Sequence, residues 1–187
     1  MINRALQEMV VAQHGDDTWQ RILKQAGVDI DMFVRMETYP DAVTYSLVGV
    51  ASEVLDAPVP RLLQDFGRYW VRYAAGQGYG PLLDEAGETL PEILGNLDEM
   101  HFRLGTVFQR YGSDAPNQPM QPPQFSCSDV TGSTLVLHYH SKRAGLGSMV
   151  IGLVEGLAER LGCTVDIHQI AFKDRGDDHD AFAVRHG

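Results

Sequence analysis

The 187-residue chain has the composition of one globular domain, with 44% hydrophobic and 21% charged residues. A formal net charge of -10, without any cluster of Lys and Arg, argues against a nucleic-acid surface, which needs a basic patch. No apolar stretch is long enough to span a bilayer, and the N-terminus lacks the apolar region of a signal peptide. Since two cysteines cannot form a disulfide framework, we expect a soluble, cytoplasmic protein.

Two short helices are predicted at the start of the chain. Leu6, Met9 and Val10 form an apolar face that precedes a turn at residues 15–17. Thr18 is expected to be the N-cap of the second helix, which should stop at Gly27.

Two further helices are predicted between residues 41 and 75. Asp41 is expected to cap the first of them, and Val59-Pro60 has the sequence of a helix start. The second helix should extend to about Ala75. The residues expected to end it are Gly76, Gly78, Gly80 and Pro81.

The helix predicted from Pro91 to about Arg110 has the clearest apolar periodicity, and His101 lies on its buried stripe. The stripe consists of Ile93, Leu94, Leu97, Met100, His101, Leu104, Val107 and Phe108. Residues 111–124 lack apolar periodicity and are rich in Pro, Asn, Gly and Gln. They predict a surface connection that ends at Pro122-Pro123.

The second half of the chain is predicted to contain two strands, a helix and two more strands. Strands are expected over residues 125–127 and 134–140, around a turn at 131–133, and a helix over 149–161. The last two strands, over residues 164–172 and 182–186, are joined by a polar hairpin turn at 174–180. Helices followed by an antiparallel sheet indicate an α+β fold.

His101 is the first candidate functional residue, because a buried imidazole needs a partner for each ring nitrogen. One interpretation is a core histidine that is hydrogen-bonded to a backbone carbonyl. The other is an axial heme ligand whose second ring N–H is held by an acceptor. Its position in the helix does not distinguish the two.

The second candidate is the end of the strand that leads into Tyr139-His140-Ser141-Lys142-Arg143. Because alternate residues of a strand share a face, Leu135, Leu137, Tyr139, Ser141 and Arg143 would pass from apolar to polar along one side. A phenol, a hydroxyl and a guanidinium form a binding site for carboxylates, since all three donate hydrogen bonds. The alternative is an ordinary strand end that runs into solvent.

Together these two segments resemble a known family. The run Asn96-Leu97-Asp98-Glu99-Met100-His101, about forty residues ahead of Tyr139-His140-Ser141-Lys142-Arg143, resembles the heme nitric oxide/oxygen binding family, H-NOX. The resemblance spans the chain and includes Phe66-Gly67-Arg68-Tyr69-Trp70, Pro122-Pro123 and Met149-Val150-Ile151-Gly152. It implies one domain over residues 1–187, in which a helical distal subdomain (1–60) packs over a proximal helix and antiparallel-sheet subdomain (61–187), with heme b between them.

The resemblance also implies roles for individual residues on the proximal side. His101 would be the proximal iron ligand. Pro123 would press on the heme and distort it from planarity, with Pro122 as the alternative because the preceding connection varies. The residues implied to bind the heme propionates are Tyr139, Ser141 and Arg143.

The distal side decides which gas is favoured. Met149 aligns with the position where O2-binding relatives have a tyrosine, and a thioether cannot donate a hydrogen bond to bound O2. We therefore expect the pocket to disfavour O2. Trp70 is expected nearby, either filling space or donating through its indole N–H, with Ala5 and Leu153 as neighbours.

The implied function is that of a gas sensor and not an enzyme. NO, or CO, would bind ferrous heme, and NO would weaken the His101–iron bond, flatten the heme and shift the subdomains. Since no output domain follows Gly187, we expect a separate partner, either a histidine kinase or a cyclic-di-GMP enzyme. The alternatives are an O2-binding protein of the same fold and a hemeless ligand-binding or structural domain.

The remaining cysteines and histidines are weaker candidates. Cys127 and Cys163, with His168, could be imagined as a zinc site, but their spacing gives no close ligand pair. His138 and His140 fall on the strand face opposite Tyr139 and are expected to have no heme role. The histidines expected to be exposed are His14, His179 and His186.

Overall fold

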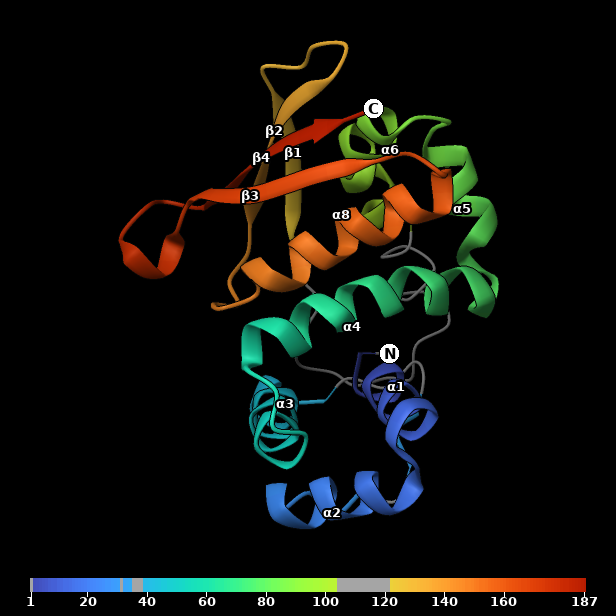
Figure 1. Ribbon diagram of the computed structural model, residues 1–187, viewed down its shortest axis with the longest axis vertical. Coiled ribbons are helices and arrows are strands. Elements are labelled where there is room, and N and C mark those ends of the chain that lie inside the picture. Colours follow the sequence, from blue (N-terminus) through green and yellow to red (C-terminus); the bar gives the residue numbers. More distant parts are fainter. Residues whose placement is uncertain (1, 31, 35–38, 104–121) are drawn as a thin grey trace.

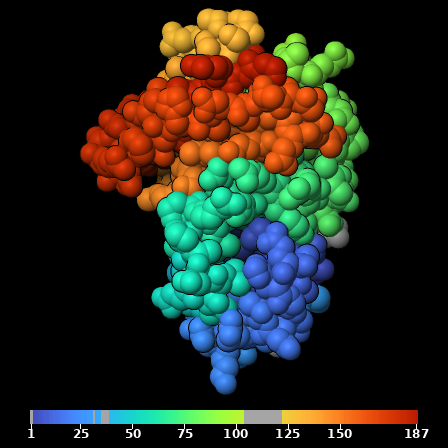
Figure 2. Space-filling model, in the orientation of Figure 1, coloured from blue at the N-terminus to red at the C-terminus, as the bar shows by residue number. Residues whose placement is uncertain are grey.

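The computed structural model describes residues 2–30, 32–34, 39–103 and 122–187. The predicted α+β architecture, a helical part packed on a part built of helices and an antiparallel sheet, is confirmed (Figure 1). In the space-filling view the N-terminal helices form one lobe, and α8 and the strands form the other (Figure 2). No described helix is long and apolar enough to cross a membrane.

The N-terminal lobe contains three helices, α1 (Ile2–His14), α2 (Asp16–Ala26) and α3 (Asp41–Val54). Two predicted caps are wrong. Gly15 precedes α2, whereas Thr18 lies within the helix and its hydroxyl donates to the His14 carbonyl oxygen at 2.8 Å. Asp41 is the first residue of α3, after Pro40, and its side chain does not cap the helix. The predicted stop at Gly27 is confirmed, with this residue in the left-handed conformation.

Helix α4 (Val59–Ala74) connects the two lobes. Its Leu62 and Phe66 belong to the N-terminal core, whereas Val71 belongs to the core beneath the sheet. The glycine-rich run ends α4 at Ala74, close to the predicted Ala75, but the chain does not pass into a loop there. The chain continues through a π-helical turn, η1 (Ala75–Tyr79), into α5 (Gly80–Ala86), and the kink is taken up by Gly78 at a φ of 95°.

The helix predicted to begin near Pro91 is divided into two segments. Helix α6 (Leu90–Gly95) ends at a turn at Asn96, and residues 97–103 are helical again. The side-chain amide of Asn96 donates to the Ala86 carbonyl oxygen at 2.8 Å, which fastens this turn to the end of α5. The predicted end near Arg110 lies outside the described residues.

The second lobe contains a four-stranded antiparallel sheet in the order β1-β2-β4-β3. The strands and their covering helix are close to the predicted ranges: β1 (Gln124–Ser128), β2 (Thr134–His140), α8 (Gly147–Leu161), β3 (Val165–Ala171) and β4 (Asp180–His186). A short 3-10 turn, η2 (Lys173–Arg175), lies in the β3–β4 connection. Helix α8 packs on the sheet face that carries Leu135, Leu137 and Tyr139, and the opposite face is not covered by it.

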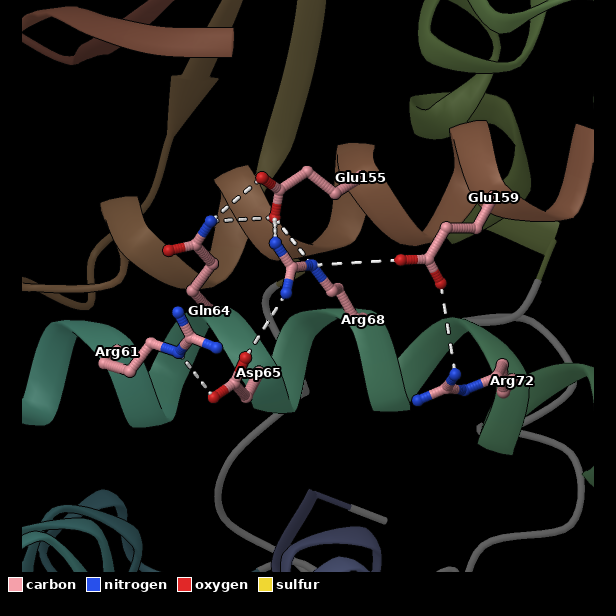
Figure 3. Close-up of polar contacts among 7 residues, drawn as sticks. All are labelled: Arg61, Gln64, Asp65, Arg68, Arg72, Glu155 and Glu159. Carbon is pink, nitrogen blue, oxygen red and sulfur yellow. Dashed lines mark hydrogen bonds and ion pairs between the residues drawn. The ribbon is translucent and has the colours of Figure 1, made fainter. Parts of the chain in front are cut away.

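Helices α4 and α8 lie side by side with their backbones in close contact (Figure 3). A Cβ atom added to Gly152 would lie 1.9 Å from the Gln64 carbonyl oxygen, and one added to Gly67 would lie 2.3 Å from the Met149 carbonyl oxygen. Beside this seam, the Glu155 carboxylate accepts hydrogen bonds from the Gln64 amide and from the Arg68 guanidinium, at 2.8 and 2.9 Å. Helix α4 is therefore packed closely along α8 of the second lobe.

Candidate functional site

His101 lies in the helical segment 97–103, half-buried, with its ring against the sheet. Its centroid is 5.7 Å from that of Phe125, and the Phe125 ring is 5.1 Å from that of Tyr139. The Nδ1 atom of His101 is buried and has no hydrogen-bond partner. Burial lowers the pKa of His101, partly offset by the carboxylate of Asp98, so the ring is neutral at neutral pH. A neutral imidazole with an unused nitrogen is suited to bind a metal.

Asp98 fixes the position of the His101 segment against strand β1. Its Oδ1 atom accepts a hydrogen bond from the backbone N–H of Phe125 at 2.5 Å. Pro123, two residues before Phe125, is half-buried, whereas Pro122 is exposed. Of the two prolines, Pro123 is therefore the more buried.

The proposed carboxylate-binding residues Tyr139, Ser141 and Arg143 lie at and just after the end of β2. Tyr139 is 4% exposed, and burial raises the pKa of its phenol, against the lowering effect of a hydrogen bond with Ser141. The Ser141 hydroxyl accepts from the backbone N–H of Arg143 at 3.1 Å, and its carbonyl oxygen accepts from the Lys173 ammonium. Only Tyr139 lies within β2, which ends at His140, so the predicted strand alternation does not extend to Ser141 and Arg143. These two residues follow the strand directly, in the bend after it.

Arg143 has a partner that no sequence pattern indicated. Its guanidinium donates to Oδ1 of Asp41 at 2.9 Å, which joins the strand end to the start of α3 in the other lobe. A second link lies beside it, because the Tyr45 hydroxyl donates to the Ala144 carbonyl oxygen at 3.1 Å. The hydrogen bond with Asp41 raises the pKa of Arg143 by more than burial lowers it, so the net pKa lies above its ordinary value.

The residues assigned to the distal side are only partly gathered. Ala5 is fully buried in the N-terminal core, and Trp70 and Met149 pack against that same core. Leu153 instead packs against the core beneath the sheet. The Trp70 ring is stacked 5.8 Å from that of Tyr73, an aromatic neighbour that the sequence analysis did not single out. The spacing of three residues along α4 could have indicated it, because side chains three apart are neighbours on a helix surface.

The remaining cysteines and histidines are placed as follows. Cys127 is half-buried, and burial raises the pKa of its thiol. Within the described ranges no group of three His, Cys, Asp or Glu side chains is arranged to hold a metal ion. The expectation of exposure holds for His14 but is wrong for His179 and His186, which are half-buried because each is packed into the sheet lobe.

Comparison with known proteins identifies the chain. The family model described as "Haem-NO-binding" matches residues 1–169. The chain belongs to the H-NOX family. This family consists of heme-based gas-sensing domains, so the chain is a sensor domain and not a catalytic one.

The curated relatives are guanylate cyclases that are much longer than this H-NOX domain. Soluble guanylate cyclase gcy-35 of Caenorhabditis elegans is 26% identical over 187 residues, which are 99% of this chain and 26% of the cyclase. Guanylate cyclase soluble subunit beta-2 of Rattus norvegicus is 31% identical over 98 residues, covering 52% of this chain and 13% of that subunit. The chain therefore spans about a quarter or less of the length of these relatives.

Solved H-NOX structures share the fold. An H-NOX protein from S. oneidensis in the Fe(II)NO ligation state superposes with a TM-score of 0.86 at 19% identity, covering 100% of this chain and 97% of that one. An unliganded Fe(II) H-NOX protein from K. algicida gives a TM-score of 0.81 at 18% identity, covering 100% and 95%. At these identities the likeness shows the fold alone.

Proposed function

We propose that this H-NOX domain binds heme b with His101 as the axial iron ligand and responds to nitric oxide. The observation that carries the proposal is the buried Nδ1 atom of a neutral His101, which has no hydrogen-bond partner. A buried ring nitrogen without a partner is unfavourable in a core histidine, but a bound metal centre supplies the missing interactions. When bound, the heme supplies a ferrous iron that takes NO or CO.

The strand end at residues 139–143 would hold the heme propionates. Tyr139 offers a phenol, Ser141 a hydroxyl and Arg143 a guanidinium, and all three can donate to a carboxylate. The Arg143 guanidinium already binds the Asp41 carboxylate at 2.9 Å, so this position is competent to hold such a group. Pro123, half-buried just before β1, is the proline we assign to pressing on the heme.

The distal side favours NO over O2. Met149 packs on the N-terminal core and has no hydrogen-bond donor, whereas stable O2 binding needs a donor close to the bound gas. Trp70 is stacked on Tyr73 within the same region, which supports a space-filling role for its ring. Ala5 and Leu153 would complete the walls of the pocket.

The signal would pass as a shift between residues 1–60 and 61–187. Weakening of the His101–iron bond would free the helical segment 97–103, which is tied to β1 through Asp98. The lobes are joined near the strand end by the exposed Asp41–Arg143 pair, a kind of contact that contributes little stability and can rearrange readily. A separate histidine kinase or cyclic-di-GMP enzyme would read the change.

The absorption spectrum of the ferrous protein tests this function. We expect a Soret band that shifts with NO and with CO, and no stable complex in air. His101→Gly should lose the axial ligand and regain the wild-type spectrum when imidazole is added, whereas His168→Gly, on the exposed face of β3, should behave as wild type. A colourless protein, a His101→Gly spectrum identical to wild type, or a stable ferrous complex in air would refute the proposal.

A further inference from the structure

Three histidines gather on the face of the sheet opposite α8. His138 and His140 alternate along β2 with the buried Tyr139, so both lie on the other side of the strand. The β3–β4 connection brings His179 against them. The Nδ1 atom of His138 is 2.8 Å from the Nε2 atom of His179, and the rings of His140 and His179 are stacked with centroids 4.2 Å apart.

Further polar groups surround this cluster, from the same β3–β4 connection and from the end of β1. The Asp178 carboxylate is hydrogen-bonded to Nδ1 of His179 at 2.5 Å, and the Ser128 hydroxyl at the end of β1 lies 2.8 Å from Nε2 of His138. Asp129 follows Ser128 and acts on the same ring. Imidazole is the side chain whose charge changes near neutral pH, so this cluster of histidines can exchange protons with solvent.

The hydrogen bond between two imidazoles limits how many protons the cluster can hold. It needs a proton on one ring nitrogen and a lone pair on the other. The Asp178 carboxylate keeps a proton on Nδ1 of His179, so the cluster can hold one positive charge without losing the bond to His138. A second proton removes the lone pair and places two cations in contact, with His140 stacked beside them.

The electrostatic surroundings agree with this limit. Burial lowers the pKa of His138, the rings of His179 and His140 lower it further, and the carboxylates of Asp129 and Asp178 raise it. The net shift is downward, so the folded protein binds protons here less well than the unfolded chain. The stability of this arrangement is therefore fully present above the ordinary histidine pKa and is lost as the pH falls from that value through the lowered one.

We propose that His138, His140 and His179 form a proton-sensitive latch, which holds the β3–β4 connection against β2 at neutral pH and releases it when the cluster gains a second proton. The connection also supplies Lys173, whose ammonium donates to the Ser141 carbonyl oxygen. Release of the latch therefore loosens a contact at the strand end that carries the propionate-binding motif. The latch itself does not depend on heme.

Nuclear magnetic resonance on the full chain tests the latch. The ring signals are titrated, and hydrogen exchange of the amides at 172–180 is measured between about pH 7.5 and 5.5 and corrected for the intrinsic rate. We expect His138 to titrate below 6.5, its ordinary value. Exchange in the connection should rise by about tenfold on acidification, because opening of the connection becomes more frequent when the bond between His138 and His179 is lost.

Two variants and a control complete the experiment. In His179→Asn the side chain can still form hydrogen bonds but cannot titrate, so exchange in the connection should no longer respond to pH. The control His168→Asn, an exposed histidine on the edge strand β3, should keep the full response. If His179→Asn does not fold, His140→Asn should raise the titration midpoint of His138. The latch is refuted if His138 titrates at its ordinary value in the wild type, or if the variants leave the pH response unchanged.

Discussion

The close contact between α4 and α8 leads to a quantitative prediction for Gly152→Ala. The new Cβ would lie 1.9 Å from the Gln64 carbonyl oxygen, where ordinary contacts begin at 3.4 Å. Since the obstacle is backbone and not a flexible side chain, the helices would have to separate by about 1.5 Å at this point. The separation would also loosen the packing of the flanking Met149 and Leu153.

The size of the effect follows from two opposing contributions. Overpacking a close contact costs about 1–3 kcal/mol, and the steric conflict at Gly152 places it towards the upper end. Replacing a helical glycine by alanine returns about 0.5–1 kcal/mol of helix propensity. The net loss of about 2 kcal/mol should lower the Tm by about 4–8 °C for a domain of this length.

Thermal unfolding followed by far-ultraviolet circular dichroism measures this change, with Gly49→Ala as the matched control. Gly49 lies inside α3, and no atom stands within 4 Å of an added Cβ. The control therefore gains only helix propensity and should raise the Tm by about 1–4 °C. If Gly152→Ala also raises the Tm, or leaves it unchanged, the close contact between α4 and α8 does not limit the residue at this position.

Three further variants test individual polar contacts. Glu155→Gln should lower the free energy of unfolding in urea by about 1 kcal/mol, because the half-buried carboxylate loses its charge-assisted bond to Arg68. Asp98→Ala should cost about 1–3 kcal/mol in the same assay, since it leaves the Phe125 N–H without its acceptor. Hydrogen bonds from backbone N–H groups lower the pKa of Glu92 in the folded protein. The stability that this carboxylate contributes is therefore present above its ordinary pKa and is lost as the pH falls from that value through the lowered one. In Glu92→Gln the free energy of unfolding should depend less on pH over this acidic range.

The elements that depend on local patterning were predicted well from the sequence. Alternation along residues 134–140 located β2 and placed Tyr139 on its buried face, and the helix predicted to end at residue 161 is α8, which ends there. The wrong N-cap of α2 arises because several neighbouring residues are equally suited to begin the helix. Asp16, Asp17 and Thr18 are all good capping residues, and the backbone of Gly15, at a φ of 84°, selects a helix start two residues before Thr18.

Contacts between segments that are distant in the sequence could not be predicted from local sequence patterns. The interruption at Asn96 depends on a hydrogen bond to Ala86, and periodicity alone continued the helix across it. His138 and His179 are 41 positions apart, and the polar composition around His179 predicted exposure. Such pairs arise only when the sheet order brings β2 beside β4, which no single segment encodes.

The pairing of Arg143 with Asp41 bears on our proposal that Arg143 binds a heme propionate, because the same guanidinium joins the two lobes. Both side chains are about half exposed, so the pair contributes at most about 1 kcal/mol, and exchange of the Asp41 carboxylate for a propionate costs little. Arg143 lies at the end of β2 in one lobe, whereas Asp41 begins α3 in the other. Under this proposal, a change in the distance between the lobes would alter how often the Arg143 guanidinium is available to a propionate. In the same way, a propionate bound to Arg143, as we propose, would weaken the contact of Arg143 with Asp41. Heme binding and the position of the lobes would then be coupled in both directions.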